Sequence, residues 1–159
     1  MTLMEILLIL AVIGILITAG LTGLRRLSQN QAYQGYVTGF SQAVSDATSR
    51  ANETNAIYAI EFSTGGYSWG PVTGGLSACS GAASAPTLTS TLGGRPAPTG
   101  VSVGDTGWFC FSAPGLVYRL GSLGNTCSYK TYTFPCLTFT GPGRSEKMFI
   151  SVGGQVVVE

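Results

Sequence analysis

The sequence predicts an α+β fold, in which a long N-terminal helix forms a spine packed on a C-terminal antiparallel β-sheet stabilised by disulfides. Three observations support this prediction. The first 24 residues are apolar except for one glutamate, and helical spacing then continues to about residue 52. Short segments rich in aromatic and β-branched residues follow, separated by turns that contain glycine or proline. All four cysteines lie after the helical segment.

The apolar run ends at Arg25-Arg26. As a helix, residues 1–24 would span about 36 Å, enough to cross a hydrocarbon core of about 30 Å. Glu5 is the only charged side chain in the run, and a carboxylate inside a membrane costs roughly 2.5–3.5 kcal/mol. We expect an N-terminal amine as its partner, either its own or that of a neighbouring copy. No basic residue precedes the run, so we expect that a basic leader has been removed and that Met1 is a mature terminus.

Residues 28–52 predict an amphipathic continuation of the same helix. Apolar side chains recur there at steps of three and four, which indicates one buried face. These side chains are Tyr33, Tyr36, Val37, Phe40, Ala43, Val44, Ala47 and Ala51. We therefore expect one helix from about residue 2 to about residue 52, with an apolar first half and an amphipathic second half.

Residues 53–159 read as strands and loops. Segments 56–62 and 67–69 predict a hairpin, and segments 108–112 and 116–120 predict two strands joined by a Pro-Gly turn. Segments 129–134 and 137–140 are weaker strand predictions. The last two strands are expected at 147–152 and 155–159, because Gly153-Gly154 is a two-residue hairpin signal. Residues 71–106 are predicted to be a long surface loop, and the Ser, Thr and Pro content of residues 77–102 could also accept O-linked sugars.

The four cysteines favour two disulfides in an oxidising compartment. Four cysteines allow three connectivities. We expect Cys127–Cys136, which encloses a short loop, and Cys79–Cys110, which closes a longer one. Their spacing does not suit a zinc site.

Composition argues against enzyme activity. Charged residues make up 9% of the 159 residues, and the formal net charge of +1 gives no indication of nucleic-acid binding. The sequence has no histidine, which is the commonest general base and metal ligand. Asp46 and Asp105 are too far apart to form a calcium loop. We therefore expect no catalytic residues, no cofactor and no metal site.

Residues 1–16 resemble the mature N-terminus of type IV pilins and related pseudopilins. The shared pattern is a Thr-Leu-x-Glu sequence followed by an apolar helix, matched here by Thr2, Leu3 and Glu5. The resemblance covers roughly residues 1–55 as a helix, and the remainder is similar only in architecture. The chain departs from the family at Met1, where the family usually has Phe, and at Thr22, where it has a helix-kinking proline.

The resemblance implies a mature major pilin of the type IV filament superfamily. Such a subunit polymerises into a helical surface filament, the type IV pilus, that supports adhesion, twitching motility or DNA uptake. Residues 1–27 would be the transmembrane and filament-core helix, and residues 28–159 the extracytoplasmic domain. A disulfide-bounded C-terminal loop is also what many type IV pilins carry.

The resemblance also implies partners and interface residues. Prepilin peptidase would methylate the amine of Met1, and the pilus assembly machinery would move the subunit from the inner membrane into the filament. The main partner would be a second copy of the chain, and DNA or a surface receptor is a possible further partner for which the sequence gives no proof. Small residues at four-residue spacing allow helices to approach closely. The expected interface residues are Met1, Glu5, Gly14, Ala19 and Gly23.

Two alternatives remain open from the residues. A pseudopilin of a type II secretion system has the same N-terminal pattern, although several major pseudopilins carry a calcium site that this sequence lacks. A membrane-anchored extracytoplasmic binding domain that does not polymerise is the other alternative. It predicts an unprocessed N-terminus and a monomer that detergent solubilises.

Overall fold

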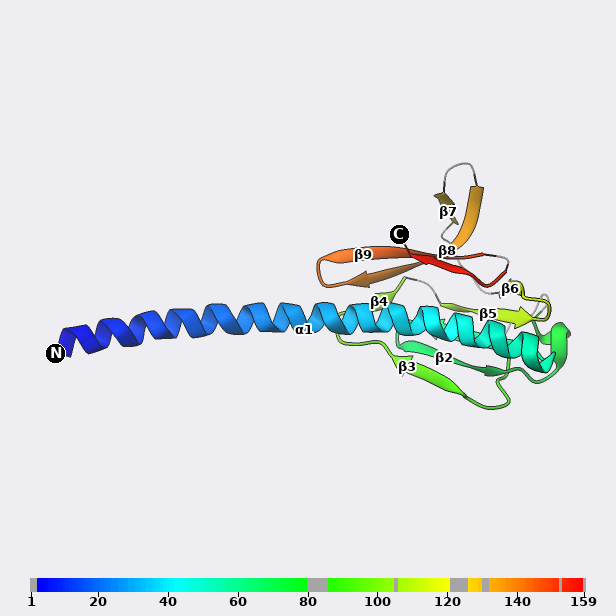
Figure 1. Ribbon diagram of the computed structural model, residues 1–159, viewed down its shortest axis with the longest axis horizontal. Helices are drawn as coiled ribbons and strands as arrows, with labels where there is room; N and C mark the ends of the chain where they lie inside the picture. Colours follow the sequence, from blue (N-terminus) through cyan, green and yellow to red (C-terminus); the bar gives the residue numbers. More distant parts are fainter. Residues whose placement is uncertain are drawn as a thin grey trace.

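One continuous helix dominates the computed structural model, which describes residues 3–79, 86–104, 106–120, 126–129, 132–151 and 153–158. Helix α1 (Leu3–Thr54) runs along the β-strands and projects far beyond them at its N-terminal end (Figure 1). Asn55 follows it with a φ of 51°, the left-handed conformation that commonly terminates a helix. The single long helix predicted from the sequence is therefore confirmed, and its glycines do not interrupt it.

The strands form two antiparallel sheets that gather around the second half of α1 (Figure 1). The first sheet has the order β3-β2-β1-β5-β6, with strands β3 (Gly93–Pro96), β2 (Gly66–Pro71), β1 (Tyr58–Ser63), β5 (Gly107–Ser112) and β6 (Leu116–Leu120). The second has the order β10-β9-β8-β4, with strands β10 (Val156–Val158), β9 (Arg144–Ile150), β8 (Tyr132–Gly141) and β4 (Ser102–Val103). Strand β7 (Thr126–Tyr129) pairs with β8, and a short 3-10 helix η1 (Gly75–Ala78) follows β2.

Two sequence predictions about the strands were wrong. The predicted loop at 71–106 contains η1 and the strands β3 and β4. The predicted strand at 129–134 covers the end of β7 and the start of β8, which pair with each other. Strand β3 was not predicted because it contains two glycines. Gly94 is needed there because the backbone of β2 lies very close: a Cβ on Gly94 would be 2.7 Å from the carbonyl oxygen of Tyr67. The three hairpins predicted elsewhere are present with small shifts of their ends.

The core lies between the second half of α1 and both sheets. All eight apolar positions predicted for the buried face of the helix are at most 5% exposed. Phe40 occupies the centre, with its ring 5.2 Å from that of Tyr67 in the first sheet and 5.3 Å from that of Phe139 in the second. The helix therefore joins the two sheets through a shared aromatic cluster.

The outer face of the first sheet is covered by the segment between β2 and β3. A disulfide joins Cys79 to Cys110 on β5, the pairing favoured from the sequence, and both cysteines are buried. The segment crosses β2 so closely that a Cβ on Gly70 would clash with the backbone carbonyl of Ser90. Cys136 is disulfide-bonded and buried. The side chain of Cys127 lies outside the described part of the chain, so its pairing stays a prediction.

Candidate subunit interface

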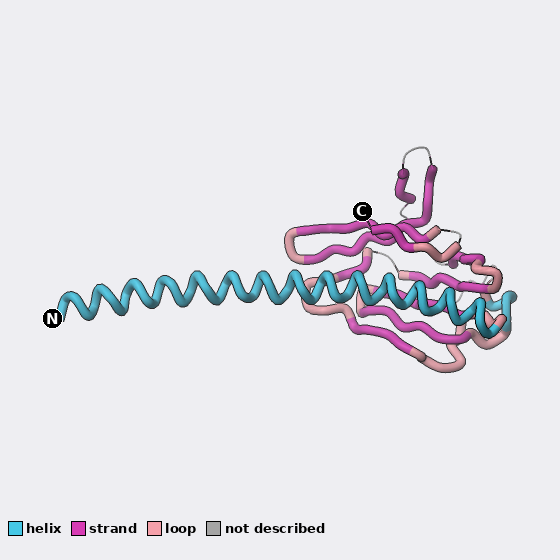
Figure 2. The backbone as a smooth tube through the Cα atoms, in the orientation of Figure 1, coloured by secondary structure: helices cyan, strands magenta, loops and turns pink. Residues whose placement is uncertain are grey.

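The first half of α1 stands clear of the β-strands. Figure 2 shows it as a bare helical segment extending from the sheets toward the N-terminus. Every described side chain from Met4 to Leu27 is exposed, and the first fully buried position along the helix is Tyr33. The fold of the domain therefore uses α1 only from about that residue onward.

The exposed segment is strongly apolar. Its large apolar side chains are between 43% and 81% exposed and lie on all sides of the helix. They are Met4, Leu7, Leu8, Ile9, Leu10, Val12, Ile13, Ile15, Leu16, Ile17, Leu21, Leu24 and Leu27. A soluble monomer rarely exposes a contiguous apolar patch above a few hundred Å², and larger patches mark association surfaces. Among the described residues, no helix combines the length and apolarity needed to cross a membrane.

Charged groups mark both ends of this apolar segment. Glu5 lies in the first turn of α1, where the partial positive charge of the helix N-terminus favours a carboxylate. Arg25 and Arg26 lie exposed where the helix reaches the domain. Arg26 also lines a small surface pocket with Pro142 and Gly143 of the β8–β9 turn.

The interface residues predicted from the sequence and described by the structure lie along the same projecting helix, but they are not close to one another. Glu5, Gly14, Ala19 and Gly23 all lie on the projecting part of α1, whereas Met1 falls outside the described residues. A Cβ added to Gly14 or Gly23 would meet nothing within 4 Å. Nothing within this copy of the domain therefore requires these two residues to be glycine. The side chain of Ala19 is outside the described set.

Sequence reasoning missed the contacts that fix the direction of the helix relative to the second sheet. The Tyr33 hydroxyl donates a hydrogen bond to the carbonyl oxygen of Phe139, at 3.1 Å. The Arg144 guanidinium covers the Tyr33 ring at 4.3 Å from its centroid, a cation–π distance. The ring also fills the space over Gly141, where a Cβ would clash with it.

A second anchor joins α1 to the first sheet. Arg95 of β3 donates a hydrogen bond to the carbonyl oxygen of Gly35, at 2.8 Å. A Cβ on Gly39, one turn later, would lie 2.9 Å from the Tyr67 hydroxyl. The only signal available in the sequence was the four-residue spacing of Gly35 and Gly39, which is typical of close packing on a helix.

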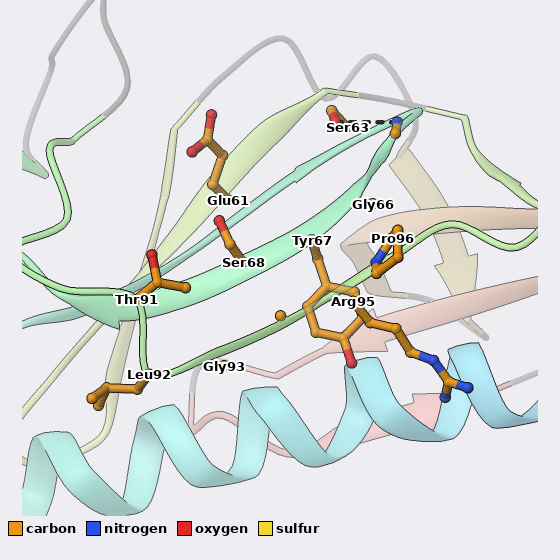
Figure 3. Close-up of a pocket in the computed structure, with 12 residues that line it drawn as sticks. Glu61, Ser63, Gly66, Tyr67, Ser68, Thr91, Leu92, Gly93, Arg95 and Pro96 are labelled. Carbon is orange, nitrogen blue, oxygen red and sulfur yellow. Dashed lines mark hydrogen bonds between the residues drawn. The ribbon is translucent and has the colours of Figure 1, made fainter.

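A shallow depression on the first sheet is lined by residues of β1, β2 and β3 and of the segments beside them. Figure 3 shows Tyr67 and Arg95 pointing toward α1, whereas Glu61 points away from the helix. Glycines of β2 and β3 contribute to its lining, and the Gly65 amide donates a hydrogen bond to the Ser63 hydroxyl, at 3.2 Å. Within the described ranges, no group of three or more His, Cys, Asp or Glu residues could hold a metal ion.

The groups with perturbed pKa values belong to the core. Burial raises the pKa of Tyr36 to about 12, and the neighbouring Tyr67 adds to the effect. Burial likewise raises the pKa values of Tyr33 and Tyr67. Burial disfavours the charged phenolate form of each side chain, which explains these directions.

Comparisons with known proteins support the fold. No family model matches the chain, and no curated protein matches it. Two crystal structures of the type IV minor pilin FimU of Pseudomonas aeruginosa (strain PAO1) are similar to it, both at 14% sequence identity. One, in space group P65, has a TM-score of 0.53 and covers 79% of this chain and 91% of FimU. The other, in space group P21, has a TM-score of 0.54 and covers 85% of this chain and 90% of FimU. The chain therefore has the α+β fold of a type IV pilin.

Proposed function

We propose that the chain is a structural subunit of a type IV filament, polymerising through the projecting half of α1. The observation that carries this proposal is the exposed apolar surface from Met4 to Leu27, which the domain leaves uncovered. Parallel packing of such helices in a filament removes that surface from water on all sides at once. Burial of apolar area contributes roughly 25 cal/mol per Å² relative to water, so a helix packed among its neighbours in a filament can remain outside the membrane.

Glu5 sets the position of each new subunit in this proposal. As the resemblance implies, its carboxylate pairs with the N-terminal amine of a neighbouring copy, or with its own. An ion pair buried among apolar helices is tolerated when both charges are matched, whereas removing one partner leaves the other uncompensated. Glu5 therefore acts as a docking residue and not as a catalytic one.

The test is filament formation by a Glu5→Ala variant in a cell that has the assembly machinery. Filaments sheared from the surface are counted by electron microscopy and their subunit content is measured by immunoblot. Wild type is expected to form filaments, Glu5→Ala few or none, and the exposed control Glu53→Ala as many as wild type. Filaments of normal number from Glu5→Ala would refute the docking role. A wild-type chain that never polymerises would refute the function itself.

The subunit's place in the filament needs a separate measurement. The resemblance points to a major pilin, which forms the shaft, whereas the similar solved structures are of a minor pilin. We propose the shaft role, because the whole circumference of the projecting helix is apolar and available to neighbours. A subunit that makes up most of the protein in sheared filaments supports this role, and a trace amount supports a minor pilin. Short structures confined to the periplasm would instead indicate a secretion pseudopilin.

Processing and location complete the proposal. The resemblance implies an inner-membrane location before assembly, an extracellular filament afterwards, and a methylated amine at Met1. Mass spectrometry of the N-terminal peptide tests the methylation, and membrane fractionation of a strain without the assembly motor tests the location. An unmethylated chain that stays monomeric in detergent would favour a tethered binding domain. Adhesion, twitching motility and DNA uptake are then separated by assays of a deletion strain.

A further inference from the structure

The charges on α1 are regularly spaced. The helix has six charged side chains, all exposed, and two long uncharged stretches at 6–24 and 27–45 separate them into groups. The groups are Glu5, then Arg25 and Arg26, then Asp46 with Arg50 and Glu53. Glu5 is 20 residues before Arg25, and Arg26 is 20 residues before Asp46. In both cases an acidic side chain lies one interval from a basic one.

Resting on the filament function above, we propose that neighbouring copies pack in parallel with an axial offset of about 30 Å, the length of 20 helical residues. At that offset, Glu5 of one copy lies level with Arg25 of the next, and Arg26 of the first lies level with Asp46 of the second. A carboxylate has two oxygens, so Glu5 can accept from both a terminal amine and Arg25. The partner of this charged face is therefore a second copy of the chain.

The directions of the side chains agree with this offset. Twenty residues turn an α-helix through about 200° beyond whole turns, so Arg25 projects almost opposite to Glu5, and Asp46 almost opposite to Arg26. Opposite projection is what two parallel neighbours related by translation need in order to face each other. Glu5 and Arg26 are about 60° apart on one side of the helix, and Arg25 and Asp46 are about 60° apart on the other. Both ion pairs can therefore form across one interface.

Other arrangements match the charges less well. Parallel helices in register place the arginines of one copy beside those of the next. Antiparallel helices centred on the arginines place Glu5 beside Asp46, which is repulsive. Neither Arg26 nor Asp46 has an ion-pair partner among the residues that the structure describes. Both are left available to a neighbour.

Charge reversal at one pair tests the offset. Asp46→Arg and Arg26→Asp each place like charges together, and each is expected to lower the yield of sheared filaments by about tenfold, because an attractive pair becomes repulsive at every repeat of the interface. The double variant Arg26→Asp/Asp46→Arg restores opposite charges and is expected to restore the yield. The double variant leaves Arg25 in place as the partner of Glu5. Circular dichroism of each variant confirms that the exposed substitutions leave the domain folded.

The control is Glu53→Arg, which makes a similar change on the same helix but has the buried Tyr33 at the matching position 20 residues earlier. It is expected to assemble like wild type. The inference is overturned if Asp46→Arg assembles normally, or if the double variant does no better than the single ones. It is also overturned if Arg26→Asp lowers the filament yield but Asp46→Arg does not, because Arg26 would then bind lipid headgroups or pair with Glu5 in an antiparallel dimer. A wild-type chain without filaments would refute the proposed function instead.

Discussion

Truncation of Phe40 to alanine should separate the folding of the domain from its assembly. Phe40 is fully buried and makes edge-to-face contacts with Phe62, Tyr67 and Phe139, at ring distances of 6.2, 5.2 and 5.3 Å. Removing a buried phenylalanine costs about 3–5 kcal/mol through lost burial and the cavity that remains. The upper end is expected here, because three aromatic pairs that join α1 to both sheets are lost together.

Urea unfolding measures this loss. The fluorescence of Trp69, which lies in the core, reports the transition in a mild detergent that covers the projecting helix. With a urea slope of about 1.5–2 kcal/mol per M, a loss of about 4–5 kcal/mol lowers the midpoint by about 2–3 M. The matched control is Leu27→Ala on the same helix, which is 54% exposed and should change stability by less than about 0.5 kcal/mol. A loss below about 1 kcal/mol for Phe40→Ala would refute the view that α1 joins the sheets through this ring.

Three further predictions follow from other parts of the structure. Replacing Cys79 and Cys110 by serine should cost about 3–4 kcal/mol, because the disulfide closes a 31-residue separation; unchanged thermal unfolding would contradict this. Tyr36 has its pKa raised to about 12, so the unfolded chain loses this proton first, near pH 10, and stability should fall from about pH 10 to 12. Tyr36→Phe should reduce that fall and keep or raise stability at pH 7, because the buried hydroxyl has no hydrogen-bond partner in the described structure. Gly23→Ala should stabilise the helix of the monomer by up to about 1 kcal/mol. It should also lower the filament yield, because the added methyl group has free space only until a second helix approaches. Equal yields would show that the residue lies away from the interface.

Local periodicity explains which parts of the fold could be predicted. The buried face of α1 was read correctly because its spacing repeats over several turns, and the β5–β6 hairpin because Pro114-Gly115 marks the turn. Strand β3 could not be read, because Gly93-Gly94-Arg95-Pro96 has neither alternation nor β-branched residues. Its conformation comes from pairing with β2, which involves residues far away in the sequence. The division into two sheets depends on the same long-range pairing.

Part of the candidate interface could likewise be predicted from the sequence, and part could not. Glu5 and the apolar segment are visible in the sequence because each is a strong departure from ordinary composition. The anchor formed by Tyr33, Gly141 and Arg144 is not, since the contacts join residues more than 100 positions apart and each residue alone is unremarkable. The anchor matters for assembly because it fixes the direction in which the projecting helix leaves the domain.

The continuity of α1 through Arg25 and Arg26 has a mechanical consequence. No proline interrupts the helix, and its described backbone is helical without a break from the apolar half into the core. The projecting half continues directly into the part of α1 that carries the buried Tyr33 and Phe40, so a position that its neighbours impose on it is transmitted to the sheets through these residues. A subunit held by its first half in an assembly therefore presents its sheets at a fixed height and rotation. An offset set by charges on the helix would in turn determine which faces of neighbouring domains meet outside it.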